Sequence, residues 1–566
     1  MGLFSAVRNA GYALEVFSTG LQVAGNNISN ANTPNYIREN LNVVTNSSYS
    51  ENGVTIGTGA RILGVKQQID KFLETRIYAA SSENSASATR SNTYKQLETI
   101  LSSLSSNDLS SGLNQFLAKV NDVANQPSSS ATRQLLIQQG QTLAGSISGL
   151  RTSVDSLRQA ANGQVSDLVN EANQLIDQIS KLNPQIVQME LAGQSGSDAS
   201  GLRNTRYAAL TRLAEIVPVK VVEQPTGQVD VFLNNDYLVL AGQTQHLETE
   251  TASDRGVPVT NVHIENSHVD ISGSGGELNG VITGRDQILG GYVDQLDAYA
   301  KNIIGTFNQI HSSGEGLAGF TDVTGSYSVN NPLQPLNAAG LTFPPQHGSF
   351  DIKVVNQQTG EVTTQTINID LDNVDTANNT SLTDLKNALN AVGNVSASIT
   401  NDGKLRITAA NGYEIKFGND SSHVLAGLGI NTFFTGTDST TIGVNQTIST
   451  NPDLLATGQG GGPGDNSNAL ALANFTSQKV SGLNNLSIDD FYQNVLSDLA
   501  QKAASEDAIS QGAATFKDSL NSQRSQYSGV SLDEEAIQIM QLQRSYQSTA
   551  KFISTVDQLY NILLDI

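Results

Sequence analysis

The chain has 566 residues, several times the usual length of one domain, so more than one hydrophobic core is expected. Hydrophobic residues make up 38 % and charged residues 15 %, and polar uncharged residues fill the gap, as in surface or extracellular proteins. The formal net charge of −22 disfavours nucleic acid and anionic lipid, which bind chiefly through Lys and Arg. Neither nucleic acid nor a membrane is therefore expected as a partner.

Cysteine is absent, which excludes disulfides, thiolate metal sites and thiol nucleophiles. Residues 1–21 include Arg8 and Glu15 where a secretory signal would have an apolar core. No run of about 18 apolar residues could cross a bilayer. The sequence predicts neither an ordinary signal peptide nor a membrane span, so another route would carry the protein out of the cytoplasm.

The amino-terminal segment carries apolar residues at alternating spacings of four and three. This stripe contains Leu3, Val7, Ala10, Leu14, Phe17, Leu21, Ala24 and Ile28. The spacing is that of a coiled coil, and the segment has no adjacent helix to bury its stripe. It therefore needs a partner that is distant in the sequence.

The carboxyl-terminal segment has the same heptad spacing. Its stripe contains Leu532, Ile539, Leu542, Tyr546, Thr549, Ile553, Val556, Tyr560 and Leu563, with Glu535 in one slot. Ser531 and Glu534 have the spacing of a capping box at the start of this helix. The two stripes favour pairing of the two ends, with all other domains between them.

Further helices are predicted at 143–189, 288–310 and 488–520, where apolar residues recur at helical spacing. Pro184 should kink or break the first of them near its end. For these helices we favour an intramolecular bundle, which is the simpler explanation of an apolar stripe.

Two parts of the chain have the pattern of strands, with β-branched and apolar runs between turn-forming residues. The first part has strands at 217–222, 229–233 and 237–240. The second has strands at 350–355, 364–371, 395–400 and 405–408, with a helix at 381–392. The predicted fold class is α+β and multi-domain, with a terminal α-helical coiled coil and a helical bundle that carries inserted β-rich domains.

These patterns also predict domain boundaries. The expected units are a terminal coiled-coil domain (1–40 with 528–566), a helical rod domain (41–199 with 284–318 and 465–527), a β-rich domain (200–283), an inserted β-rich module (319–440) and a flexible return linker (441–464).

The sequence offers little for catalysis or metal binding. Of six histidines only His263 and His268 are close, and with Glu265 and Asp270 they could in principle supply ligands, but a polar turn between two strands is the favoured explanation. No HExxH, GxSxG or GxxxxGK[ST] motif occurs. We expect no enzyme activity, no cofactor and no metal.

Residues 26–36, NNISNANTPNY, resemble the amino-terminal signature of flagellar rod, hook and hook-associated proteins. Asparagine side chains compete for the backbone where the helix ends, and Pro34 forces Thr33 into an extended conformation. The family usually has glycine where this chain has Asn35. Asparagine tolerates the left-handed region better than most other residues, so a turn is still expected there.

Segments 57–76, 202–214 and 528–546 narrow the resemblance to the hook-associated protein 1 family. This resemblance implies a secreted, extracellular subunit of the bacterial flagellum that leaves the cell through the flagellar type III apparatus. It would join hook to filament at the distal end of the hook and be required for filament assembly. The implied partners are further copies of the chain in a tubular homo-oligomer, the hook protein, a second hook–filament junction protein and a cytoplasmic export chaperone.

The expected assembly interface combines the two stripes with the signature. It contains Leu3, Val7, Leu14, Phe17, Leu21, Ile28, Asn32, Pro34, Tyr36, Leu542, Tyr546, Ile553, Val556, Tyr560 and Leu563. Two alternatives stay open. Hook or distal rod protein shares the signature, and a secreted β-rich adhesin would account for the β-rich parts but should show a signal peptide or an anchor.

Overall fold

The computed structural model describes all residues except 1, 34, 52–53, 104–107, 193–195, 268–270, 272–274, 373–378 and 565–566. The chain divides into two compact units. Unit 1 comprises 1–93, 159–285 and 503–566, and unit 2 comprises 94–158 and 286–502. The two units together contain many helices and several small antiparallel sheets, which confirms the predicted α+β, multi-domain fold class. The predicted domain boundaries themselves stay a prediction.

Unit 1 holds both chain ends. Helix α1 (Gly2–Ser29) is followed by strands β1 (Glu39–Thr45), β2 (Tyr49–Glu51), β3 (Val54–Ile56) and β4 (Ala60–Gln67), and α13 (Leu532–Leu564) ends the chain. Strands β1 and β4 pair antiparallel, with a register shift between Asn42 and Val43. The sequence analysis named none of these four strands.

Long helices run through much of the chain, namely α2 (Lys71–Ser103), α4 (Ser130–Ala192), α5 (Ser200–Ile216) and α12 (Ile488–Ser528). Of the kink or break expected at Pro184, the break does not occur, because α4 continues to Ala192 with Pro184 inside it. Leu182 and Ile186, on either side of the proline, are buried in one cluster with Ala199, and this packing offsets the lost backbone hydrogen bond.

Helix α2 was missed because the middle of its buried face is made of small residues, between the larger Leu73, Ile77 and Leu97. Ala80, Ser81, Ser82, Ala86 and Ser87 are all buried, and serine does not register as part of an apolar stripe. The Ser87 hydroxyl donates a hydrogen bond to the carbonyl of Glu83, 2.9 Å away, so burial leaves this polar group satisfied.

The β-rich part of unit 1 matches the predicted strands at 217–222, 229–233 and 237–240. One sheet has the order β5 (Val219–Glu223), β6 (Val229–Leu233), β7 (Asp236–Leu240) and β8 (Gln243–Thr244), and β9 (Leu247–Asp254) pairs with β10 (Val257–Ile264). Helix α6 (Gly276–Thr283) follows. The sheet, α5 and the second half of α4 share one hydrophobic core, which includes Leu210, Val231 and Ile176.

Two buried arginines of α5 connect this core to the turn between β5 and β6. Arg203 Nε lies 2.6 Å from Glu190 Oε1, and Arg203 Nη1 lies 2.6 Å from Glu223 Oε1. Arg206 donates to the carbonyl of Gly227 at 2.7 Å. Gly227 has a φ of +87°, and a Cβ there would lie 2.5 Å from Glu190 Oε2, so both backbone and space require glycine. The segment 202–206 is therefore structural.

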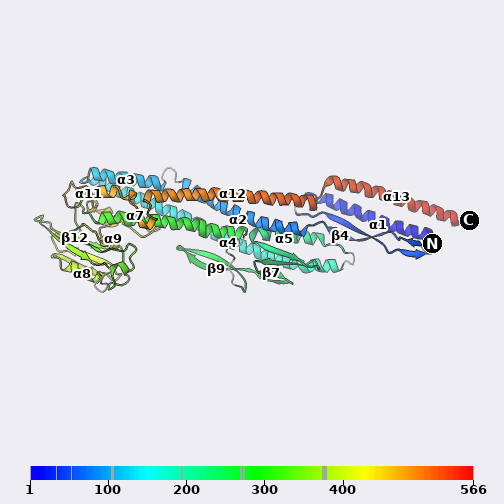
Figure 1. Cartoon of the computed structure of the whole chain (residues 1–566), viewed down its shortest axis with the longest axis horizontal. Helices are drawn as coiled ribbons and strands as arrows, with labels where there is room; N and C mark the ends of the chain where they lie inside the picture. The colour runs from blue at the N-terminus through cyan, green and yellow to red at the C-terminus, as the bar shows by residue number, and fades with distance from the viewer. Residues whose placement is uncertain are drawn as a thin grey trace. The chain divides into compact units, whose positions relative to one another are not determined.

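Unit 2 contains the second predicted β-rich part. Its helices are α3 (Leu109–Asn125), α7 (Gly290–Ser312), α8 (Leu382–Asn390), α9 (Val424–Leu428), α10 (Gln446–Thr450) and α11 (Ser467–Ala473), and a π-helix, η1 (Gly284–Leu289), precedes α7. One sheet has the order β13 (Val362–Ile369), β12 (Gly348–Asn356) and β16 (Tyr413–Gly418), and the other β11 (Asp322–Thr324), β15 (Leu405–Ala409) and β14 (Val395–Ile399). Figure 1 shows β12, α8 and α9 close together within this unit.

The strands and the helix predicted for this part are confirmed. Ser381 caps α8 by accepting a hydrogen bond from the Asp384 amide, and the Asp384 carboxylate accepts one from the Ser381 amide in return. The stretch 441–464, expected as a flexible linker, contains β18 (Gly443–Val444), which pairs with β17 (Phe434–Thr435), α10 and a 3-10 turn (Pro452–Leu454). Leu455 within it is fully buried, so part of this stretch is packed.

His311 is fully buried in the core of unit 2, beside a cluster of phenylalanines. Its Nδ1 lies 2.8 Å from the carbonyl oxygen of Asn431, and its Nε2 accepts a hydrogen bond from the Ala456 amide at 3.1 Å. Both contacts suit a neutral ring that carries its proton on Nδ1. Burial, with a smaller contribution from the charge of Arg133, lowers the pKa of His311 to about 4.

This buried histidine predicts acid sensitivity of unit 2. Because its folded pKa lies below the unfolded value of 6.5, His311 contributes stability that is present above pH 6.5 and is lost as pH falls toward 4. The full loss is about 3 kcal/mol for a shift of this size. His311→Asn should flatten the pH dependence of urea unfolding in this window. Phe433→Leu is the control, because it disturbs the adjoining packing and removes no titratable group; equal slopes in the two variants would contradict the prediction.

Candidate assembly interface

The two ends of the chain lie side by side as a pair of antiparallel helices. Helices α1 and α13 contact each other along their length, and Figure 1 shows both chain termini at the same end of this pair. Residues near the start of α1 face the last turns of α13, while Gly20 contacts Leu542 further along. The predicted pairing of the two stripes is therefore confirmed, and its direction is antiparallel.

Small residues mark the closest approach of the two helices. Ala10, Gly20 and Ala24 are buried in α1. A Cβ at Gly20 would lie 3.0 Å from a methyl carbon of Leu542 and 3.7 Å from one of Leu41 in β1. Helix α1 therefore lies between α13 and the β1–β4 hairpin, and larger side chains such as Leu21 are only half-buried at its flanks.

The terminal turns enclose an apolar groove. The groove has a volume of about 460 Å³ and is lined by Leu3, Phe4, Val7, Ala550, Ile553, Ser554, Val556, Asp557 and Tyr560. Val556 is buried, whereas the Phe4 side chain is 80 % exposed. The pair of helices therefore leaves apolar surface uncovered at its free end.

Five of the fifteen predicted interface residues line this groove. Leu3, Val7, Ile553, Val556 and Tyr560 line one groove, and Leu542 contacts Gly20. The other residues of the α1 stripe are half-buried, namely Leu14, Phe17, Leu21 and Ile28, while Tyr546 is 40 % exposed. Asn32 is exposed; Pro34 and the side chain of Leu563 lie outside the described residues.

The signature segment closes the turn after α1 through one buried side chain. Asn27 Nδ2 donates to the Glu39 carbonyl at 2.9 Å, and Asn27 Oδ1 accepts from the Glu39 amide at 3.0 Å. The Tyr36 hydroxyl donates to the same Oδ1 at 2.9 Å. Burial, followed by the charges of Glu39 and Glu535, raises the pKa of Tyr36, so the phenol stays a neutral donor.

The remaining asparagines of the signature end the helix. Asn30 Nδ2 donates to the Asn26 carbonyl at 3.0 Å and so satisfies an acceptor at the carboxyl end of α1. Asn35 adopts a φ of +60°, the left-handed conformation expected where the family has glycine. The sequence analysis included Asn32 and Tyr36 in the interface but missed Asn27, although its place in the signature was a signal.

Arg38 connects the amino-terminal segment to the start of α13. Its amide donates to the Ser528 carbonyl at 2.9 Å. Its Nη1 lies 2.8 Å from Glu534 Oε2 and its Nε lies 2.7 Å from Glu535 Oε1. The Glu534 amide is 3.4 Å from the Ser531 hydroxyl, so half of the predicted capping box forms, while the Glu534 side chain pairs with Arg38.

A second set of apolar side chains lies along α13, outside the stripe that packs against α1. Its members are each about half exposed: Ile537, Met540, Phe552, Leu559 and Ile562. They follow one another at intervals of three, twelve, seven and three residues, and Phe552 also lines a groove beside Ala10 and Ala13 of α1. These residues were not named from the sequence. We refer to these five residues as the outer stripe.

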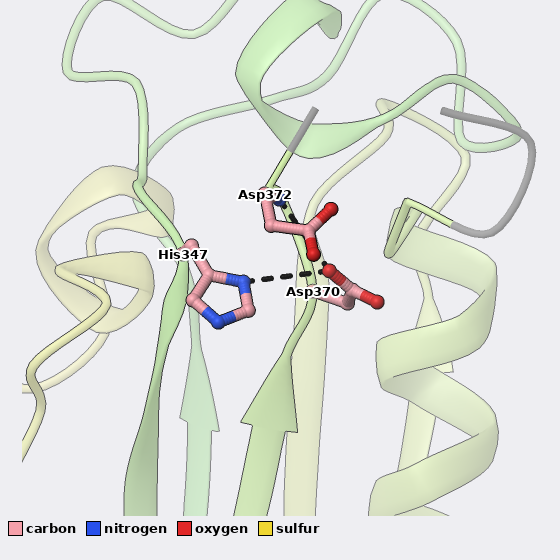
Figure 2. Close-up of side chains that lie close together, drawn as sticks. All are labelled: His347, Asp370 and Asp372. Carbon is pink, nitrogen blue, oxygen red and sulfur yellow. Dashed lines mark hydrogen bonds and ion pairs between the residues drawn. The ribbon is translucent and has the colours of Figure 1, made fainter. Parts of the chain in front are cut away.

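The described residues contain one group of three side chains whose ligand atoms could meet at a cation, and Figure 2 shows it. The potential ligand atoms of His347, Asp370 and Asp372 lie within 4.8 Å of one another. His347 Nδ1 lies 3.4 Å from Asp370 Oδ1 and accepts a hydrogen bond from the Leu371 amide at 3.3 Å. These contacts explain the cluster without an ion.

The histidines named in the sequence analysis do not add to this group. His263 Nε2, in β10, lies 3.3 Å from Glu248 Oε2 across the β9–β10 hairpin, while His268 and Asp270 lie outside the described residues. Among the helices described, none combines the length and the apolarity that a membrane span requires.

Comparison with known proteins places the chain among flagellar structural proteins. Residues 94–325 match the model of the flagellar hook-associated protein FlgK helical domain, and residues 521–566 match that of the flagellar basal body rod FlgEFG protein C-terminal region. The chain is a hook-associated structural component of the bacterial flagellum and serves motility.

Full-length relatives narrow this assignment. Flagellar hook-associated protein 1 of Salmonella typhimurium is 25 % identical, with 99 % of this chain and 100 % of the relative covered. The protein of the same name from Escherichia coli is 24 % identical, with 99 % of this chain and 100 % of the relative covered. The one from Bacillus subtilis is 21 % identical, with 99 % of this chain and 98 % of the relative covered. The flagellar hook junction protein FlgK from Burkholderia pseudomallei covers 81 % of this chain and 100 % of its own, at a TM-score of 0.49 and 16 % identity. The chain is thus similar over its full length to flagellar hook-associated protein 1, whose family is a structural and not an enzyme family.

The Asn27 contacts predict a local stability effect. Asn27→Ala would leave the buried amide and carbonyl of Glu39 without partners, at a cost of about 1–3 kcal/mol for each group. Hydrogen exchange at the Glu39 amide should accelerate by at least tenfold. Gln22→Ala, at an exposed position of α1, is the control and should leave this exchange rate near that of the unaltered chain. Unchanged protection of Glu39 in Asn27→Ala would show that the side chain does not hold the turn.

Proposed function

We propose that the chain forms the hook–filament junction at the distal end of the hook and is required for filament assembly. It acts there as a secreted, extracellular subunit of a tubular homo-oligomer. Its neighbours are further copies of itself, the hook protein and a second hook–filament junction protein. The observation that carries the proposal is the pair of terminal helices, whose outer stripe stays exposed in the single chain and is available to neighbouring subunits. The full-length similarity to flagellar hook-associated protein 1 supports it.

The apolar surface of the terminal pair supports contact with other subunits. Full burial of a large apolar side chain stabilises by roughly 1.5–3 kcal/mol, and each member of the outer stripe is only half covered within the chain. Neighbouring subunits can cover the outer stripe and the groove beside Phe4 at once. We therefore extend the predicted assembly interface, from Leu3 to Leu563, to include the outer stripe.

Export through the flagellar type III apparatus, aided by a cytoplasmic chaperone, fits the physical properties of the chain. The sequence has no cysteine, so no disulfide can lock a compact form before passage through a narrow channel. The terminal helices bury little surface by themselves, and packing supplied by neighbours would complete their folding. Assembly and folding of the ends are then coupled.

Two other functions rank lower. A hook or distal rod protein would share the signature at 26–36, but the match of residues 94–325 to a hook-associated helical domain favours the junction. A secreted β-rich adhesin would use the sheets of unit 2 for binding. The similarity to flagellar hook-associated protein 1 extends over 99 % of this chain and therefore disfavours adhesion as the primary role.

Deletion of the gene tests the proposed function directly. The deletion strain should carry hooks without filaments, release flagellin into the medium and lose swimming motility, because filament subunits would have no junction to assemble on. Electron microscopy and immunoblots of the medium measure these outcomes. A plasmid copy should restore filaments. Normal filaments on the deletion strain would rule out the junction role, and missing hooks would favour the hook or rod alternative.

The outer stripe gives a second prediction. Met540→Asp places a charge on the outer stripe, where burial against a neighbour would cost several kcal/mol, while contacts with α1 stay intact. Filament number per cell should fall at least tenfold although secretion persists. Asn561→Asp is the matched control, because it adds the same charge at an exposed position of α13 outside the stripe. Equal filament numbers in the two variants would exclude the stripe from assembly.

A further inference from the structure

The contact between the two ends of the chain contains a buried charged pair. The side chain of Glu535 is 1 % exposed and that of Arg38 is 16 % exposed, and their charged atoms lie 2.7 Å apart. The backbone amide of Arg38 is held at the same place by the Ser528 carbonyl. This pair joins the segment after α1 to the first turn of α13.

The apolar contacts between α1 and α13 do not define a unique alignment by themselves. They follow a heptad repeat, and α1 offers small residues such as Ala10, Gly20 and Ala24 at its closest contacts. Sliding α13 by one heptad, about 10.5 Å at 1.5 Å per residue, would bring Thr549 or Glu535 opposite Gly20 in place of Leu542. The stripe of α13 would still face α1, because a shift of seven residues keeps the same side of the helix turned toward its partner.

The charged pair is different, because it can form in one alignment only. After a slip of one heptad, Glu535 would lose Arg38, and a buried charge without its partner is strongly destabilising. Polar residues buried among apolar heptads are known to select register in coiled coils in the same way.

We infer that Arg38 and Glu535 set the register in which the two ends of the chain pair. The register decides which residues of α1 and α13 lie opposite each other, and therefore how far the end of each helix extends beyond its partner. Its consequence for subunit contacts rests on the proposed function, whereas the register itself can be measured in the purified chain alone.

Disulfide trapping can report the register, because the chain has no cysteine of its own. Gly20→Cys with Leu542→Cys reports the observed alignment, in which these two positions are in contact. Gly20→Cys with Thr549→Cys reports a slip of one heptad in one direction, and Ala13→Cys with Leu542→Cys reports the opposite slip. Mild oxidation of dilute monomer, followed by gel electrophoresis, measures the yield of each disulfide.

With Arg38 and Glu535 present, we expect the Gly20–Leu542 disulfide to dominate by at least tenfold. Arg38→Met with Glu535→Leu replaces the pair by apolar side chains of similar size, which keeps the ends together but removes the selection. The slipped disulfides should then rise at least tenfold. Arg90→Met with Glu506→Leu is the matched control, because it removes another ion pair of unit 1, also 2.7 Å long, and should leave the trapping pattern unchanged.

Three outcomes would overturn the inference. The first is a double variant that still traps only the Gly20–Leu542 disulfide. The second is a chain with the native pair that traps the slipped disulfides equally well. The third is a double variant that traps no disulfide, which would show that the pair holds the ends together and does not select their register. None of these results bears on the deletion phenotype, so the two proposals fail independently.

Discussion

The antiparallel contact between α1 and α13 is the constraint on which the rest of unit 1 depends. It joins the first and the last helix of a 566-residue chain, so the chain must return to its starting point. Unit 1 is accordingly assembled from three separate stretches, and unit 2 from two. Loop closure over such distances is costly, but its entropy grows only slowly with loop length, and the cores of the two units offset it.

Buried polar side chains add specificity to this contact. The Asn27 side chain makes hydrogen bonds to both the amide and the carbonyl of Glu39, as a neighbouring strand would. The guanidinium of Arg38 forms an ion pair with the carboxylate of Glu535. Each group would be costly to bury without its partner, so it selects one arrangement among several of similar apolar burial. The signature at 26–36 is then a structural element of the closed ends, besides being a mark of the family.

A flagellar structural protein needs surface that is free in the monomer and covered in the assembly. The outer stripe and the groove beside Phe4 have this property, since the chain leaves large apolar side chains exposed on helices whose other faces are packed. The cluster of His347, Asp370 and Asp372 is explained by its own contacts, among them the hydrogen bond from the Leu371 amide to His347 Nδ1.

The sequence alone determined the elements with strong periodicity. The stripes of α1 and α13, the strands of both β-rich parts and the capped helix α8 follow from spacing and turn chemistry, because these signals are local. Local patterns did not reveal α2, where alanine and serine occupy the middle of the buried face. They also did not show that α4 continues past Pro184, where Leu182 and Ile186 are buried in one cluster. Only the tertiary structure decided the direction of the terminal pair, the small residues at its closest approach and the roles of Asn27, Arg38 and Glu535. The physical reason is that a heptad repeat shows which face of a helix is apolar but not which segment will cover that face. The hydrogen-bond partner of a buried polar group can be identified only once the segments distant in the sequence are placed side by side.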